Sequence, residues 1–154
     1  MDDLTLLIPA KHEEGSLPIL LEELKKYNLK ILVVMSQNDI ETLEAIKTYP
    51  CEILFQKNEG YGSALKEGIE KITSKYLCIF NADGSFNPIE LENMYSLLKE
   101  NNFIFGSRYI QNGSSDDDSF LTYIGNQVFS TIGKFFFSIK LKDILYTFIM
   151  GETE

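Results

Sequence analysis

An apolar run followed at once by polar residues occupies positions 76–84: Tyr76-Leu77-Cys78-Ile79-Phe80-Asn81-Ala82-Asp83-Gly84. Its first five residues show no alternation of apolar and polar side chains, which is typical of a strand covered on both faces. Similar short runs occur elsewhere in the sequence, at residues 4–8, 31–35, 52–55 and 103–106. The chain is therefore predicted to contain a mostly parallel β-sheet.

Stretches with helical periodicity separate these runs, at residues 17–27, 39–49, 62–72 and 88–99. The first of them repeats leucine at positions i, i+3, i+4 and i+7 from Leu17, which gives a helix one apolar face. Strands that alternate with such helices are the pattern of parallel strands joined by crossover helices. We therefore expect an α/β fold of Rossmann-like type, with helices flanking the sheet.

Composition narrows the class of protein. The 154 residues are 44% hydrophobic, which suits one globular domain. A net charge of -9 disfavours a nucleic-acid-binding protein, so anionic ligands must be held locally, by a metal, a few bases or backbone N–H groups. Cys51 and Cys78 lack metal-ligand spacing and are expected to be buried thiols. Because no membrane-spanning stretch or signal peptide is evident, we expect a soluble cytoplasmic protein.

One compositional break divides the chain. Residues 111–119 are polar and acidic, and we expect a flexible loop there. Residues 120–154 are rich in aromatic side chains with scattered lysines, including Lys134, Lys140 and Lys142. That segment either rests against a membrane surface or supplies core or dimer contacts. We expect a single domain whose α/β core comprises residues 1–110.

The end of the first predicted strand carries polar residues. Ligands bind at the carboxyl ends of strands in open parallel sheets. There the chain reads Pro9-Ala10-Lys11-His12-Glu13-Glu14, whose side chains could contact a base, a ribose or a phosphate. The simpler interpretation is a helix N-terminus, because acidic residues favour a first turn. His12 is the sole histidine and has no second ligand nearby, so it does not indicate a metal site.

The third predicted strand leads into a Gly-x-Gly turn that opens an amphipathic helix, with the sequence Lys57-Asn58-Glu59-Gly60-Tyr61-Gly62-Ser63-Ala64. Backbone N–H groups at such a junction can bind an anion. The glycines could equally serve only a tight turn and close packing of the helix. The dinucleotide-binding fingerprint is incomplete, because the third glycine is missing.

The fourth predicted strand ends in two oxygen-bearing side chains one residue apart, Asn81 and Asp83. Both project to the same side of the chain, and together they could hold Mg²⁺ or Mn²⁺ and so bridge two phosphates. The alternative is an Asx-turn, in which Asp83 and Gly84 only reverse the chain.

Four motifs, taken in order, resemble those of the inverting GT-A glycosyltransferases of family 2: Ile8-Pro9-Ala10-Lys11-His12-Glu13, Lys57-Asn58-Glu59-Gly60-Tyr61-Gly62-Ser63-Ala64, Asn81-Ala82-Asp83-Gly84 and Gly106-Ser107-Arg108-Tyr109. The last motif and Gly125-Asn126 resemble specifically the polyprenyl-phosphate glycosyltransferases, such as dolichol-phosphate mannose synthase. The likeness covers nearly the whole chain. It implies a GT-A fold, a nucleoside-diphosphate-sugar donor, Mg²⁺ or Mn²⁺ as cofactor, and a polyprenyl phosphate acceptor at a membrane surface.

The resemblance also implies roles for individual residues. Asp83 and Arg108 are the candidate catalytic residues, with Arg108 facing the phosphate of donor or acceptor. Asp83 and Asn81 are the candidate metal ligands, and residues 120–154 form the acceptor side. The candidate nucleotide-sugar-binding residues are Pro9, Ala10, Lys11, Glu13, Val34, Ser36, Lys57, Gly60, Gly62, Asn81, Ala82 and Asp83.

Two departures from the family pattern concern the donor. Family members usually carry Asp-Asp-Gly-Ser after the second strand, with acids for the base or ribose, whereas this chain reads Met35-Ser36-Gln37-Asn38-Asp39. The identity of the nucleotide is therefore open. Asn81 stands where the metal motif normally begins with aspartate, and the lost charge should weaken cation affinity.

Other departures concern the first strand end and the C-terminal part. Lys11 and His12 replace a usual tyrosine and asparagine. Asp143-Ile144-Leu145-Tyr146-Thr147-Phe148-Ile149 aligns with a segment that often reads Asp-x-x-x-Gly-Phe-Arg, so Ile149 supplies no guanidinium to a phosphate.

The resemblance implies a single displacement at the anomeric carbon, in which a polyprenyl phosphate oxygen attacks and the nucleoside diphosphate leaves. The altered motifs favour a second hypothesis, in which a catalytically impaired relative binds a nucleotide or a partner as a regulatory or assembly subunit. A third hypothesis, a nucleotidyltransferase on the same fold, needs a glycine-rich loop that residues 8–15 lack.

Overall fold

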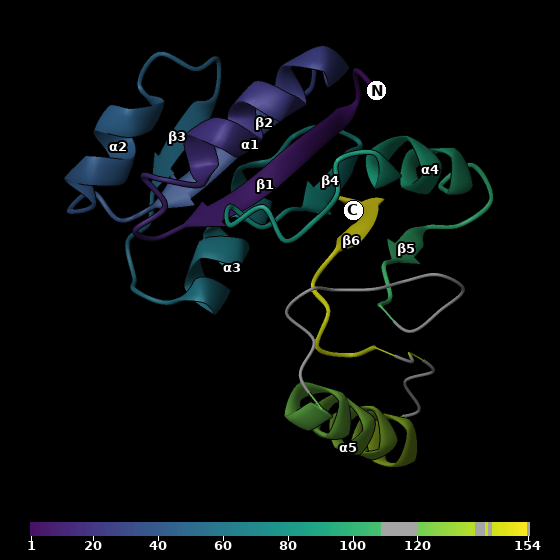
Figure 1. Ribbon diagram of the computed structural model, residues 1–154. Helices are drawn as coiled ribbons and strands as arrows, with labels where there is room; N and C mark the ends of the chain where they lie inside the picture. The colour runs from purple at the N-terminus through teal and green to yellow at the C-terminus, as the bar shows by residue number, and fades with distance from the viewer. Residues whose placement is uncertain (109–119, 138–140, 142, 154) are drawn as a thin grey trace. The chain divides into compact units, whose positions relative to one another are not determined.

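The computed structural model describes residues 1–108, 120–137, 141 and 143–153 (Figure 1). Tyr109, the acidic stretch 111–119, Lys140 and Lys142 lie outside the described residues. The chain forms two compact units, the first made of Met1–Ile104 with Ile149–Glu154 and the second of Phe105–Phe148. The expectation of a single domain stays a prediction.

A six-stranded sheet has the order β3-β2-β1-β4-β6-β5. Its strands are β1 (Leu4–Ala10), β2 (Lys30–Met35), β3 (Glu52–Phe55), β4 (Tyr76–Ile79), β5 (Phe103–Phe105) and β6 (Ile149–Glu152). The pairs β1–β2, β1–β4 and β2–β3 are parallel, and β4–β6 is antiparallel. This confirms the predicted α/β fold with a mostly parallel sheet.

Strand β6 is the element that the sequence analysis missed. Residues 120–154 were expected to be one aromatic segment, but Ile149–Glu152 inserts between β4 and β5, with Met150 opposite Cys78. Met150 is fully buried. The run is short and is interrupted by Gly151, so it carries no strand pattern of its own, and its pairing partner lies far away in the sequence.

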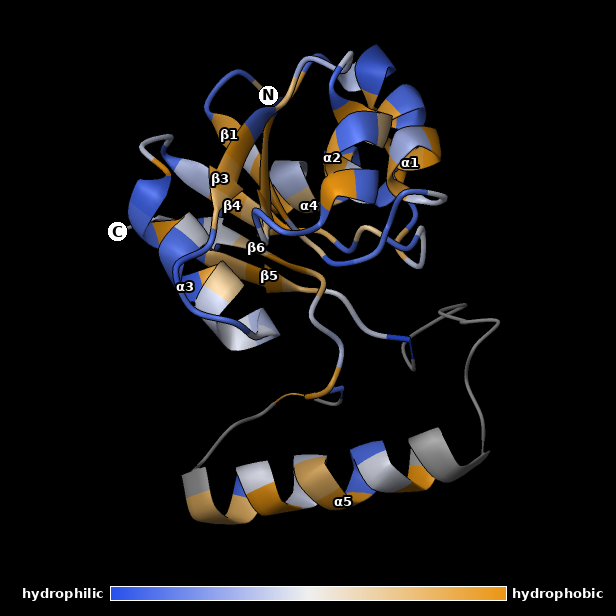
Figure 2. Cartoon of the chain, turned by 90° about the vertical axis from the view of Figure 1, so that its left-hand side faces the viewer, coloured by the Kyte–Doolittle hydropathy of each residue, from blue (hydrophilic) through white to orange (hydrophobic). Residues whose placement is uncertain are grey.

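The helices of the first unit lie where periodicity predicts them, within shorter limits. They are α1 (Leu17–Leu24), continued by a 3₁₀ turn η1 (Lys25–Tyr27), α2 (Ile40–Ile46), α3 (Tyr61–Lys71) and α4 (Glu90–Leu97). Helices α1, α2 and α4 cover one face of the sheet and α3 the other (Figures 1 and 2). The periodicity of residues 39–49 and 62–72 predicts that Ile40 and Ile69 face the core, but they are 56% and 37% exposed. Thr42 and Ile46 are the buried residues of α2.

Helix α3 lies very close to the sheet. Ala64 and Ile72 pack against buried side chains of β1, β2 and β4, among them Leu7 and Val34. A Cβ atom added to Gly68 would lie 2.3 Å from Leu7 Cδ1, so only glycine fits there without displacing a neighbour. This contact places the first turn of α3, and the loop before it, at the carboxyl edge of the sheet.

The cysteines differ in burial. Both are free thiols; Cys78 is buried as predicted, and burial raises the pKa of its thiol, whereas Cys51 is only half-buried.

The second unit contains helix α5 (Phe120–Phe137) and the chain segments on either side of it. The Gly106 N–H donates to the carbonyl of Phe148 at 2.8 Å, and the Leu145 N–H donates to the side-chain oxygen of buried Asn126 at 3.3 Å. Among the described residues, no helix has the length and apolar character needed to span a membrane.

Candidate functional site

A cleft of about 760 Å³ opens in the first unit at the carboxyl ends of its parallel strands. Segments that follow all four parallel strands contribute to its walls. The lining residues are Pro9, Ala10, Lys11, His12, Glu13, Ser36, Asn38, Asp39, Gln56, Glu59, Gly60, Tyr61, Ala64, Asn81, Ala82 and Asp83. Glu13 and Asp83, which come from the ends of β1 and β4, therefore share one cleft.

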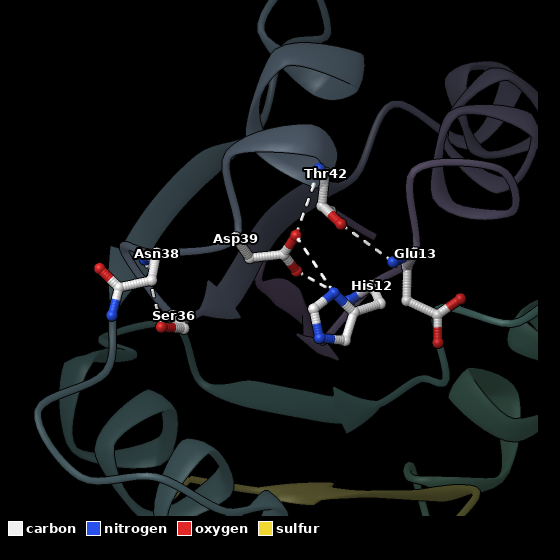
Figure 3. Close-up of polar contacts among 6 residues, drawn as sticks. All are labelled: His12, Glu13, Ser36, Asn38, Asp39 and Thr42. Carbon is white, nitrogen blue, oxygen red and sulfur yellow. Dashed lines mark hydrogen bonds and ion pairs between the residues drawn. The ribbon is translucent and has the colours of Figure 1, made fainter.

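The segment after β1 is held by the start of α2 (Figure 3). The His12 N–H donates to Asp39 Oδ2 at 2.8 Å, and the Glu13 N–H donates to Thr42 Oγ1 at 2.9 Å. Asp39 also accepts from the Thr42 N–H at 3.3 Å, as an N-cap does. The expected acidic first turn was wrong, because α1 begins only at Leu17 and Glu13 lies before it.

Asp39 is buried and ionised. Burial by itself raises the pKa of its carboxyl, but the hydrogen bonds from His12 and Thr42, with the charge of His12, outweigh this and hold the pKa below its ordinary value. The His12 backbone adopts the left-handed conformation, with φ 57°, which histidine tolerates better than most residues. Its imidazole Nδ1 lies 3.9 Å from Asp39 Oδ1 and remains largely exposed in the cleft.

The segment after β2 presents neutral groups. Ser36 and Asn38 line the cleft, and the Asn38 N–H donates to Ser36 Oγ at 3.2 Å. The only carboxylate in this segment is that of Asp39, and it is engaged by backbone N–H groups of two segments. A ligand at this end of the cleft would therefore meet mainly hydroxyl and amide groups.

At the end of β4, the Asx-turn that was the alternative interpretation is present. The Ser85 N–H donates to Asp83 Oδ1 at 2.9 Å, Asn81 Nδ2 donates to Ser85 Oγ at 3.1 Å, and Gly84 has φ 79°. Asn81 and Asp83 nevertheless line the cleft, with Asp83 exposed. The turn and a ligand-binding role are compatible, because the Asx-turn uses one carboxylate oxygen.

The oxygen ligands at this turn could hold a divalent cation only together with further ligands from elsewhere. Over the described residues, no group of three or more His, Cys, Asp or Glu side chains is placed to hold a metal. The β4 end offers one carboxylate and one amide, and Mg²⁺ commonly binds through one or two carboxylates plus substrate phosphates and water. The cleft walls also carry the carboxylates of Glu13, Asp39 and Glu59 against the single lysine Lys11, so a bound diphosphate would need added positive charge.

The loop between β3 and α3 forms the remaining wall. Gly60 is the N-cap of α3 with φ 108°, a conformation that favours glycine. This agrees with the tight-turn interpretation for Gly60. At Gly62 an added Cβ would meet nothing within 4 Å, so close packing does not explain that glycine.

Arg108 belongs to the second unit and is held by Asp143. Its Nε and NH2 groups donate to the two oxygens of Asp143 at 3.0 and 2.9 Å, and its backbone N–H donates to Oδ2 at 3.0 Å. The Asp143 side chain is fully buried, and the guanidinium lies 5.2 Å from the centroid of the Tyr146 ring. Such a bidentate pair fixes the guanidinium in position.

The cleft gathers most of the predicted donor-site residues, but not all. Val34 is fully buried in the core beneath α3, and Lys57 and Gly62 lie beside the cleft without lining it. The lining residues that sequence reasoning did not assign are His12, Asn38, Asp39, Gln56, Glu59, Tyr61 and Ala64. For Asp39 a signal existed, since an aspartate immediately before the first apolar residue of a predicted helix, here Ile40, predicts an N-cap.

The sequence resembles glycosyltransferases over most of its length. The model of the family described as "Glycosyl transferase family 2" matches residues 5–153. An uncharacterized glycosyltransferase of Mycobacterium tuberculosis is 27% identical over 97 residues, which cover 63% of this chain and 44% of that protein. An uncharacterized protein of Methanocaldococcus jannaschii is 26% identical over 132 residues, or 81% of this chain and 54% of that protein.

Solved structures share the fold at low identity. Mannosyl-3-phosphoglycerate synthase from Rubrobacter xylanophilus superimposes with a TM-score of 0.75 at 14% identity, covering 97% of this chain and 53% of that one. Glucosyl-3-phosphoglycerate synthase from Mycobacterium tuberculosis, in complex with Mn²⁺, uridine diphosphate and glucosyl-3-phosphoglycerate, gives a TM-score of 0.74 at 10% identity, covering 97% and 56%.

The chain thus spans about half the length of these relatives and structures. The structural likeness confirms the GT-A architecture, and the cleft lies at the sheet edge where the family motifs were expected. Since the family model matches nearly every residue, the chain belongs to glycosyl transferase family 2.

Proposed function

We propose that this chain is the donor-binding part of an inverting glycosyltransferase that transfers a sugar from a nucleoside-diphosphate sugar to a polyprenyl phosphate, as in the branch of dolichol-phosphate mannose synthase. The observation that carries the proposal is the cleft shared by Glu13 and Asp83. Polar groups from the ends of four parallel strands converge there, at the edge of the sheet where α/β folds bind ligands.

The donor would lie along this cleft. Pro9, Lys11, Glu13 and the neutral groups Ser36 and Asn38 would contact the nucleoside, and the diphosphate would lie toward Asp83. Support comes from the glucosyl-3-phosphoglycerate synthase structures, which contain uridine diphosphate together with Mn²⁺ or Mg²⁺. Asp83 and Asn81 would hold such an ion, which supplies positive charge to the leaving diphosphate.

The reaction would be one displacement. An acceptor phosphate oxygen forms a bond to the anomeric carbon while the bond from that carbon to the nucleoside diphosphate breaks, and the diphosphate leaves with the electron pair. A phosphate nucleophile is already ionised, so no strong general base is needed. The chain's own residues would act by holding the donor in line and by keeping charge near the leaving group.

The second unit would bind the acceptor at the surface of a membrane. Support comes from the Gly106-Ser107-Arg108 motif, in which Asp143 holds the guanidinium of Arg108 in position. Further support comes from helix α5 (Figure 2). Phe135 and Phe136 of α5 are 81% and 70% exposed. Aromatic side chains of this kind suit a peripheral contact with lipid. A homodimer through the same aromatic residues is the alternative use of this helix.

A second candidate function is a regulatory or assembly subunit that binds a nucleotide or a partner without catalysis. The observation in its favour is the metal motif, in which Asp83 is the single carboxylate and Asn81 occupies the position of a second. With one charge fewer, a cation would be held more weakly.

Calorimetric titration separates the transferase from a subunit that binds only a partner. Uridine, guanosine and cytidine diphosphates are each titrated into the protein with and without Mn²⁺. The proposed function predicts that at least one of them binds, and that Mn²⁺ tightens its binding. If none of the three binds under either condition, the transferase proposal is wrong and the partner-binding subunit is favoured.

A further inference from the structure

We infer that Glu67, a residue of α3 outside the cleft, is a positioning residue that holds the β3–α3 loop in the shape that binds the donor. The expected effect of Glu67 on nucleotide affinity rests on the proposed function. Its structural part, the fastening of the loop, can be tested on the free protein.

Glu67 is joined to the loop by both carboxylate oxygens. Oε2 accepts the Lys57 N–H at 2.8 Å, and Oε1 accepts the Asn58 N–H at 3.2 Å. Oε1 also accepts from Ser63 Oγ at 3.1 Å and from the Asn58 side-chain amide at 3.5 Å. The bond from the Lys57 N–H is the main cause that holds the pKa of Glu67 below its ordinary value, so the carboxylate is ionised near neutral pH.

The loop that Glu67 fastens is a wall of the cleft. Gln56 precedes the two bonded residues, and Glu59, Gly60 and Tyr61 follow them, and all four of these residues line the cleft. Gly60 adopts φ 108°, so the chain turns sharply between the fastened residues and α3. Releasing Lys57 and Asn58 would therefore free a stretch that contributes a quarter of the lining.

A role in helix stability does not explain this side chain. Glu67 is the seventh residue of α3, beyond the first turn in which a negative charge is favoured by the helix dipole. Apart from the bond from Ser63 in the same helix, its contacts reach back nine and ten residues in the sequence, to a loop. Helix α3 itself is anchored elsewhere, through Ala64, Gly68 and Ile72, which face the sheet.

The two bonds require a carboxylate rather than an amide. Two backbone N–H donors point at the two oxygens of Glu67, one at each. In Glu67→Gln, one of these positions becomes an NH₂ group, which cannot accept. Glu67→Gln should therefore keep one bond, and Glu67→Ala should keep neither.

The experiment compares Glu67→Gln and Glu67→Ala with the wild type and with Glu70→Ala as a matched control. Glu70 is an exposed glutamate on the same helix and does not line the cleft. The first readout is hydrogen exchange of the Lys57 and Asn58 amides in the free protein. We expect both amides to exchange faster in Glu67→Ala, and one of them in Glu67→Gln, with melting temperatures close to the wild type.

The second readout is the affinity, with Mn²⁺, for whichever of uridine, guanosine and cytidine diphosphate binds the wild type most tightly. If the released loop is in the binding shape about a tenth of the time, affinity falls roughly tenfold in Glu67→Ala and less in Glu67→Gln. Glu70→Ala should bind as the wild type does.

The two readouts separate the possible failures. Unchanged exchange of both amides in Glu67→Ala overturns the inference, and so does faster exchange with unchanged affinity. If the wild type binds no nucleotide, the proposed function fails, and the exchange data alone decide whether Glu67 fastens the loop.

Discussion

The side chain of Asp39 both stabilises the fold and shapes the cleft. Its carboxylate caps α2 and accepts the N–H of His12, 27 residues earlier in the sequence. Family members usually carry acids for the base or ribose after the second strand, whereas the one acid of this segment contacts the backbone of the neighbouring wall. Ser36 and Asn38 are left as the polar groups of that segment facing the cleft.

Replacing Asp39 by asparagine tests this role through stability. Because the folded pKa of Asp39 lies below its ordinary value of 3.8, ionised Asp39 stabilises the fold above that pH, and the contribution is lost as the pH falls below it. Asp39→Asn leaves one buried N–H donor without an acceptor, at a cost of about 1–3 kcal/mol at pH 7. Urea denaturation between pH 7 and pH 3 should show a less stable variant with a weaker loss on acidification. Equal stability of both proteins at pH 7 would contradict the role.

We propose that the side chain at position 81 sets how strongly the cleft holds a cation. Asn81→Asp adds a second carboxylate beside Asp83, so we expect Mn²⁺ to bind roughly tenfold more tightly in the presence of uridine diphosphate. Asn87→Asp is the matched control, because it adds the same charge nearby and keeps the acceptor that bonds the Ile89 N–H at 3.0 Å. Equal Mn²⁺ affinity in Asn81→Asp and Asn87→Asp would mean that position 81 is not a ligand.

At the scale of elements, the contact between α3 and β1 determines where the cleft lies. Gly68 allows the helix to approach Leu7 so closely that a Cβ would collide with it. The helix N-terminus, with Gly60 and Tyr61, is thereby carried to the carboxyl ends of β1 and β3.

Gly68→Val should push α3 from the sheet and destabilise the protein by about 1–3 kcal/mol, the usual cost of overpacking a core. Gly62→Ala is the control on the same helix, since an added Cβ there meets nothing within 4 Å, and it should gain up to about 1 kcal/mol. Thermal unfolding of both variants measures the difference. A Gly68→Val variant as stable as the wild type would show that the packing is loose.

Sequence reasoning was strongest where a signal is local. The apolar runs of β1 to β4 and the periodicity of α1 to α4 predicted the sheet and its flanking helices, because each pattern is complete within one element. Strand β6 was not predicted, because only its position between β4 and β5 makes Met150 a core residue. The same limit applies to the site: motifs brought Asp83 and Glu13 to attention, whereas the fastening of loops by Asp39 and Glu67 depends on contacts between separate segments.

At the scale of the whole molecule, the acidic charge and the acidic cleft pose one problem for an anionic donor. The net charge of -9 and the carboxylates of Glu13, Asp39, Glu59 and Asp83 repel a diphosphate, which Lys11 alone does not offset. We therefore expect nucleotide and cation to enter the cleft together. The expected need for a cation thus follows from the cleft carboxylates of this chain itself.

A crystal structure of the protein with uridine diphosphate and Mn²⁺ tests that claim most directly. We expect the diphosphate in the cleft at the ends of β1 and β4, with the ion in contact with Asp83 and with phosphate oxygens. A nucleotide bound outside this cleft, or bound within it with the ion away from Asp83, would contradict the account.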